Sequence, residues 1–200
     1  MFSINPFDLP PRDAYRLMIS AIVPRPIAWV SSIGKNGSLN LAPFSFFNGI
    51  GGNPPTLMIS VGLRKGQPKD TLRNVQENGE FVVNMVSEAL GPQMSLTAGE
   101  YDYEVDEFAL AGLTPASCDL IKPPRVGEAA VAMECRATQF VQVTGTTYTV
   151  IFGQILCYHI KDGLLRPDGL IDADAMRPLA RLGGDQYATL QPVFELKRPA

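Results

Sequence analysis

Aromatic and polar side chains alternate in one short segment, Ala42-Pro43-Phe44-Ser45-Phe46-Phe47-Asn48. A hydrophobic core uses phenylalanine, but it has no use for a serine and an asparagine placed among the rings. A flat and partly polar ligand needs both kinds of residue, because its faces pack against apolar groups while its rim needs hydrogen-bond partners. The segment therefore indicates one wall of a ligand site.

A second segment, Lys69-Asp70-Thr71, has the residues of an anion site. It opens a helix predicted over residues 69–79, in which Asp70 caps the first turn and Gly79 ends the helix. The first amides of a helix lack intrahelical partners, and an adjacent lysine adds a positive charge. The alternative is a capped surface helix with a solvated lysine, and the local sequence leaves both open.

The histidine and the cysteines exclude several other kinds of chemistry. His159 is the single histidine, and Cys118, Cys135 and Cys157 are far apart with no CxxC pair. A site of three cysteines and this histidine is possible by count, but its spacing resembles no zinc knuckle, so we expect no metal. No GxSxG elbow supplies a serine for a Ser-His-Asp triad. We expect three free thiols in a reducing compartment.

The elements that must position these residues are mostly short strands. We expect a helix over 11–23, helical or irregular structure over 87–113, and a loop-rich tail over 161–200. The six expected strands are 27–33, 38–46, 55–63, 80–86, 129–143 and 148–160. Many strands with few helices favour a small barrel over a doubly wound sheet, and no GxGxxG motif follows a strand.

The first two strands form a hairpin through the Asn36-Gly37 turn. With a loop of two or four residues, one face would carry mostly core residues, namely Ala28, Val30, Ser32, Leu39 and Leu41. The other face would be either a ligand wall or a wet outer surface, and its residues would be Trp29, Ser31, Ile33, Asn40, Ala42 and Phe44. A loop of three or five residues would reverse this pairing.

Composition and charge narrow the class of protein. The chain has 200 residues and a net charge of −3, with its lysines and arginines scattered. Nucleic acid is therefore not an expected partner, because phosphate backbones bind a basic face. No secretory signal begins the chain, and no apolar run reaches the roughly 18 residues of a membrane span. We expect a cytoplasmic protein that forms a single domain over residues 1–200.

Taken in order, RPIAWVSS (25–32), NLAPFSFFN (40–48) and KDT (69–71) resemble the flavin reductase-like, FMN-binding split-barrel family, which includes the flavoredoxins. The segments at 151–165 and 178–187 are similar to the closing strand and C-terminal arm of that family. The resemblance covers roughly residues 10–190. It implies a mainly β fold with a few helices: a six-stranded antiparallel Greek-key split barrel, with a core over about 10–160 and an arm over 161–200.

The resemblance also implies a cofactor and its position. FMN would lie at the boundary between the subunits of a homodimer. The residues implied to bind it are Trp29, Ser31, Ala42, Pro43, Phe44, Ser45, Phe47, Asn48, Lys69, Asp70, Thr71 and Arg181. Arg181 has an alternative role, which is to anchor the tail through a salt bridge.

The implied activity is hydride transfer from NAD(P)H to FMN, with no side chain assigned as catalytic. Reduced flavin would then serve a partner oxygenase or another redox partner. The alternative is an FMN-bearing electron carrier of the flavoredoxin type, reduced by a partner protein and without its own nicotinamide site. Some members carry a GGDH-like turn where this chain has VTGTTYTV, with Thr147 near the histidine position, so nicotinamide specificity stays open. His159 is either near the flavin or a strand histidine bonded to a carbonyl.

Overall fold

A computed structural model describes residues 1–190 and 193–197 of the chain. Its helices are α1 Pro11–Ala21, α2 Asp70–Asn78, α3 Gly91–Leu96, α4 Glu107–Ala111 and α5 Ala173–Met176, with 3-10 turns at Pro6–Asp8 and Glu88–Leu90. Its strands are β1 Arg25–Pro26, β2 Ala28–Ile33, β3 Leu39–Phe44, β4 Phe47–Gly52, β5 Pro55–Arg64, β6 Gln67–Pro68, β7 Glu80–Met85, β8 Pro115–Ala116, β9 Arg125–Val126, β10 Val131–Gln142, β11 Tyr148–Ile160, β12 Leu179–Arg181 and β13 Tyr187–Thr189. Of the helices in these residues, none is both long and apolar enough to cross a membrane.

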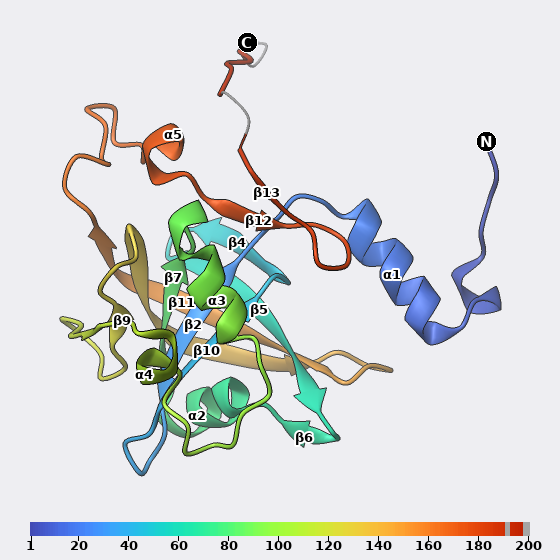
Figure 1. Ribbon diagram of the computed structural model, residues 1–200, viewed down its shortest axis with the longest axis horizontal. Helices are drawn as coiled ribbons and strands as arrows, with labels where there is room; N and C mark the ends of the chain where they lie inside the picture. Colours follow the sequence, from blue (N-terminus) through green and yellow to red (C-terminus); the bar gives the residue numbers. More distant parts are fainter. Residues whose placement is uncertain (191–192, 198–200) are drawn as a thin grey trace.

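One antiparallel sheet carries the fold, in the order β3-β2-β7-β10-β11-β5-β4 with β6 beside β5 (Figure 1). The strands β2, β3, β5, β7, β10 and β11 are the six expected from the sequence, so the mainly β, antiparallel class is confirmed. Strands β4 and β6 are additional. The sequence of β4, FNGIGG, hides it because glycine is depleted in strands. The strands at the two ends of the sheet, β3 and β4, follow each other directly in the chain. At their junction, Ser60 N of β5 donates to Phe46 O at 2.8 Å, so the two ends of the sheet are linked.

Both faces of the β2–β3 hairpin are buried, against two different cores. One face places Val30 and Phe44 in the barrel interior, in the same core as Ile59 of β5. The other face packs Trp29 and Leu41 under α3 and α4, which lie over the sheet in Figure 1. The hairpin therefore has no wet outer surface.

The predicted pairing of the hairpin faces is wrong. Gly34 N donates to Ser38 O at 2.9 Å, which leaves three residues in the loop, and Gly37 there has a positive φ of 84°. Trp29 consequently pairs with Pro43, and Val30 pairs with Ala42. The side chains of Ala42 and Phe44 thus share a face with Ala28 and Val30, whereas Trp29 and Ser31 share the opposite face with Leu41.

The helix predicted over 69–79 is α2, but its start differs from the prediction. Lys69 is the N-cap residue, and no side chain caps the helix, so the cap assigned to Asp70 is wrong. Asp70 is instead the first helical residue. Its carboxylate is 3.5 Å from Arg64 Nη2. The predicted end is confirmed, because Gly79 adopts the left-handed conformation that glycine favours.

The N-terminal helix and the C-terminal arm meet beside the barrel. Helix α1 ends two residues before the predicted limit at residue 23, and none of its residues is buried. The tail predicted as loop-rich contains α5, β12 and β13, and β12 pairs with both β1 and β13. Figure 1 shows α1 beside the turn that joins β12 to β13. This junction borders the candidate site.

Candidate functional site

A cleft of about 410 Å³ opens where β3, the start of α2, the α3–α4 connection, α1 and the arm meet. Each of these elements contributes side chains to it. The lining residues are Tyr15, Ile19, Arg25, Ile27, Asn40, Ala42, Pro43, Phe44, Ser45, Arg64, Lys69, Asp70, Thr71, Met94, Thr97, Ala98, Gly99, Glu100, Glu107, Arg181 and Tyr187. We call the part around Asn40, Lys69, Asp70, Thr71 and Glu107 the α2 end, and the part around Arg25, Ser45, Arg181 and Tyr187 the arm end.

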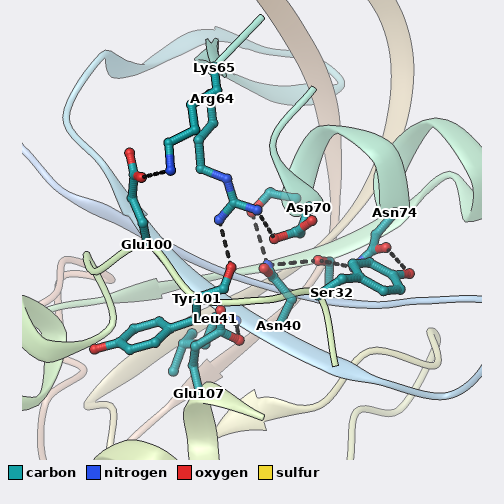
Figure 2. Close-up of polar contacts among 12 residues, drawn as sticks. Ser32, Asn40, Leu41, Arg64, Lys65, Asp70, Asn74, Glu100, Tyr101 and Glu107 are labelled. Atoms are coloured by element: carbon teal, nitrogen blue, oxygen red, sulfur yellow. Dashed lines mark hydrogen bonds and ion pairs between the residues drawn. The ribbon is translucent and has the colours of Figure 1, made fainter. Parts of the chain in front are cut away.

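A buried polar network forms the floor of the α2 end (Figure 2). Asn40 Nδ2 donates to Thr71 Oγ1 at 2.9 Å and to Ser32 Oγ at 3.2 Å. Asn74 Nδ2 also donates to Ser32 Oγ, at 3.1 Å, and Asn74 Oδ1 accepts from the hydroxyl of Tyr103 at 2.8 Å. These bonds hold the side chains of Asn40 and Thr71 in fixed orientations, so the floor is rigid before any ligand arrives.

The α2 end keeps a positive charge that contacts within the described residues do not neutralise. Asp70 is paired with Arg64, which also donates to Tyr101 O at 2.8 Å (Figure 2). Lys69 forms no salt bridge within the described residues. Burial lowers the pKa of Lys69, and the neighbouring Arg64 lowers it further. Because the first amides of α2 point away from the helix, an anion here meets both a lysine and a helix N-terminus.

Glu107 brings a buried carboxyl group to the same end. It is 7% exposed, and its Oε2 accepts from Leu41 N at 3.1 Å, on the side of β3 that no strand covers. Burial raises the pKa of Glu107 to about 7, against the opposing effect of that hydrogen bond. The group can therefore hold or release a proton near neutral pH.

The arm end is organised around Arg25, whose guanidinium is buried. It donates to Ile19 O, to Ile22 O at 2.7 Å and to Leu182 O at 2.8 Å, and it reaches Ser45 Oγ at 3.4 Å. One side chain thus joins α1, the arm and the cleft wall.

Arg181 lies next to this junction. Its guanidinium stacks over the ring of Tyr187 at 4.5 Å, donates to the Tyr187 hydroxyl and to Gly184 O, and lies 3.8 Å from Asp185. Arg181 lines the cleft and also anchors the arm, and its contact with a cofactor stays a prediction.

The cleft brings together most of the residues predicted to bind a cofactor. From the predicted set, it is lined by Ala42, Pro43, Phe44, Ser45, Lys69, Asp70, Thr71 and Arg181. Residues 42–45, which we call the wall segment, and the start of α2 therefore face one cavity, although Ser45 and Lys69 lie 24 positions apart in the sequence.

Trp29 and Ser31 do not line the cleft, because the hairpin register turns both toward the second core. Trp29 is fully buried, and its Nε1 donates to Thr97 Oγ1 at 2.8 Å. Ser31 Oγ donates to Pro124 O at 2.6 Å and accepts from Asn84. Trp29 still acts on the cleft indirectly, since Thr97 is one of its lining residues.

Phe47 and Asn48 also lie outside the cleft of this chain. Phe47 is half-buried on β4 and packs against the barrel core. Asn48 is exposed, and its Oδ1 accepts from Gly49 N at 2.9 Å. A contact of either residue with a cofactor stays a prediction.

Neither candidate position for a histidine near the flavin borders the cleft. Thr147 is exposed at the turn between β10 and β11. His159 is on β11, where its Nε2 lies 2.6 Å from Glu134 Oε1. The partner of His159 is thus a carboxylate rather than the carbonyl considered from the sequence.

Several lining residues escaped prediction from the sequence. Glu107 and Arg64 are separated from the wall segment along the chain, and no local pattern marks their side chains as cleft-facing. Tyr15 and Tyr187 belong to the terminal segments, which pack together only in the folded chain. Asn40 was expected on the ligand wall of the hairpin but not among the residues implied to bind the cofactor, and it lines the cleft.

Comparison with known proteins gives consistent matches. The model of the flavin reductase like domain matches residues 19–180. An uncharacterized protein of Aquifex aeolicus (strain VF5) is 46% identical over 174 residues, covering 86% of this chain and 88% of its own length. The crystal structure of nitrilotriacetate monooxygenase component B from Bacillus cereus is 38% identical with a TM-score of 0.94, covering 98% of each chain. That of the Pseudomonas fluorescens 2-nitrobenzoate 2-nitroreductase NbaA is 30% identical with a TM-score of 0.90, covering 99% of this chain and 96% of its own.

Proposed function

The chain belongs to the flavin reductase-like family, and on that premise we propose that it binds FMN and is an NAD(P)H-dependent flavin oxidoreductase. The observation that carries the proposal is the pairing, in one cleft, of the α2 end with the wall segment 42–45. A phosphate and a ring system on one ligand need these two surfaces together.

The residues present fit FMN in chemical terms. Lys69, the first amides of α2 and the Thr71 hydroxyl supply donors for a phosphate, and Arg64 offsets the charge of Asp70. Pro43 and Phe44 offer apolar surface for a ring system, and Ser45 offers a hydroxyl for its polar rim. FMN, when bound, would accept a hydride from NAD(P)H and so carry the redox chemistry.

The protein's own part in the reaction is positioning and charge. The network of Asn40 and Thr71 keeps the α2 end rigid, where the phosphate would bind. The wall segment would hold the ring system in one plane. Glu107 can hold a proton in the cleft near neutral pH. None of these roles requires a histidine, which agrees with the distance of His159 from the cleft.

A partner oxygenase is the proposed recipient of the reduced flavin. Support comes from the Bacillus cereus structure, whose name assigns that protein to a monooxygenase as its component B. A different redox partner is the alternative recipient.

We also propose a homodimer with α1 in the interface. Helix α1 has no buried residue, and its apolar side chains Leu17, Met18 and Ile22 are 43%, 41% and 59% exposed. A second copy would cover them. Sedimentation of the Leu17→Glu, Met18→Glu double variant is expected to give half the wild-type mass, whereas Arg12→Glu on the same helix keeps it. Equal masses for wild type and double variant would contradict this interface.

The activity is tested by anaerobic titration of the FMN-loaded protein with NADH and with NADPH. Loss of the visible flavin absorbance, faster than for free FMN, is the expected result with at least one of them. If neither bleaches the flavin while dithionite does, the protein is an electron carrier reduced by a partner. If the desalted protein is colourless and cannot be reconstituted with added FMN, both flavin functions fail.

A further inference from the structure

A cluster of metal-binding side chains lies away from the cleft, on the outer face of β10 and β11. Asp119, Glu134, Cys157 and His159 each bring one ligand atom to within 4.8 Å of the other three. We call these four residues the donor cluster. None of them lines the cleft.

The strand register explains why these side chains meet. Glu134 pairs with Cys157, and Ala132 pairs with His159, in the β10–β11 ladder. Residues two apart on a strand share a face, so Cys157 and His159 point to the same side as Glu134. The segment that precedes β9 then crosses this face and adds Asp119.

The backbone of the segment that precedes β9 fixes the orientation of the Glu134 carboxylate. This carboxylate is fully buried and accepts from Asp119 N at 2.7 Å and from Leu120 N at 2.8 Å. Backbone donors that orient a carboxylate are what the outer shell of a metal site supplies.

The charge balance of the donor cluster also favours a cation. It gathers two carboxylates and a thiol around one imidazole. Arg125 and Lys161 line a hollow next to the donor cluster, together with His159. Their positive charges repel a cation at the edge of the site.

We propose that the donor cluster binds a divalent transition-metal ion, and that zinc is the ion its donors fit. A thiolate and an imidazole suit zinc, whereas magnesium and calcium take oxygen ligands. His159 coordinates through Nε2 as a neutral imidazole whose proton lies on Nδ1, and the thiol proton of Cys157 passes to solvent. With four protein ligands the site is closed and structural, tying the crossing segment to β10 and β11.

The expectation of no metal came from the spacing of cysteines and histidine alone. Two of the four donors are carboxylates, and the cluster joins a loop to two strands. No spacing motif describes such a set, so the register of β10 against β11 was needed to find it.

The test is titration of the metal-free, full-length protein with Co²⁺ and, separately, Zn²⁺. The expected results are one ion per chain, thiolate-to-cobalt charge-transfer absorption and a rise of the melting temperature with Zn²⁺. Cys157→Ser is expected to abolish the charge-transfer absorption, and His159→Gln to weaken binding at least about tenfold. Cys118→Ser removes a neighbouring thiol outside the donor cluster and is expected to change neither result.

Three outcomes would overturn the proposal. One is the absence of binding by wild type whose circular dichroism confirms a folded chain. Another is charge-transfer absorption that survives Cys157→Ser or disappears in Cys118→Ser. The third is binding that persists undiminished in the Cys157→Ser, His159→Gln double variant, which identifies an adventitious ion only.

Discussion

The two ends of the cleft are built from different kinds of contact. At the α2 end, polar side chains contact one another: Asn40 donates to Thr71 and to Ser32. At the arm end, Arg25 donates mainly to backbone carbonyls of α1 and the arm. The first end belongs to the barrel and its covering helices, and the second exists only while both terminal segments are docked.

This difference separates ligand chemistry from assembly. The α2 end holds titratable groups whose pKa values are shifted by burial, so its response to pH and to anions is a property of a few side chains. The arm end holds a guanidinium whose donors are occupied by the chain itself. Substitutions at the first end should therefore change ligand affinity or the pH dependence of stability, whereas those at the second end should change stability at every pH.

The largest effect is expected from Arg25→Ala. The change leaves the carbonyl groups of Ile19, Ile22 and Leu182 without their donor, and α1 and the arm lose their link. We expect a loss of about 3–5 kcal/mol in the free energy of unfolding, measured by urea denaturation. Arg25→Lys keeps the charge but not the several donors, so an intermediate loss is expected. An Arg25→Ala variant as stable as wild type would show that the arm end assembles without this residue.

Glu107→Gln is expected to reveal the titration at the α2 end. The pKa of Glu107 is raised from 4.5 to about 7, so the folded state holds its proton where the unfolded state has lost it. This contribution to stability is full below pH 4.5 and disappears as pH rises through 7. Glutamine mimics the protonated acid, so the variant should gain up to about 3 kcal/mol over wild type between pH 4.5 and 8.

The measurement for Glu107→Gln is urea denaturation of both proteins at pH 5 and pH 8. Asp106→Asn is unsuitable as a control because Asp106 caps α4. Glu104→Gln is the control, because Glu104 is a nearby exposed carboxyl group that caps no helix. A constant difference between wild type and Glu107→Gln across this range would mean that Glu107 is ionised throughout.

Lys69→Ala should act on affinity and leave stability almost unchanged. Lys69 makes no salt bridge within the described residues, and its removal costs only a cation–π contact with the Phe44 ring, at 5.7 Å from the ring centroid. We expect FMN binding to weaken by about 1–3 kcal/mol, measured by fluorescence quenching of the flavin. Lys35→Ala, at the exposed hairpin turn, is the matched control. Equal weakening in both variants would assign the effect to net charge rather than to the α2 end.

Local patterns in the sequence predicted the parts of the site that lie within one element. The run 42–45 and the helix start at Lys69 were recognisable because side-chain alternation and helix-end chemistry act over a few residues. The six long strands were recognisable for the same reason. The face that Trp29 occupies was not, because one residue more or less in the hairpin loop reverses it.

Contacts between distant segments set the rest of the site. Arg64 offsets Asp70, and Glu107 reaches Leu41 across 66 residues of sequence. Trp29 supports Thr97 from beneath the cleft wall. Each depends on which elements pack together, a property of the whole fold that no window of sequence contains.

The smallest effect on stability is expected from Ser45→Ala, which lies where the two ends of the cleft meet. Its hydroxyl accepts only a long hydrogen bond of 3.4 Å from Arg25, whose other donors stay occupied, so the melting temperature should change little. If Ser45 instead faces the polar rim of bound FMN, the variant should shift the flavin reduction potential, measured by anaerobic dye titration. A stability loss with an unchanged potential would assign Ser45 to the Arg25 junction. The wall segment would then belong to the assembly of the arm end rather than to ligand chemistry.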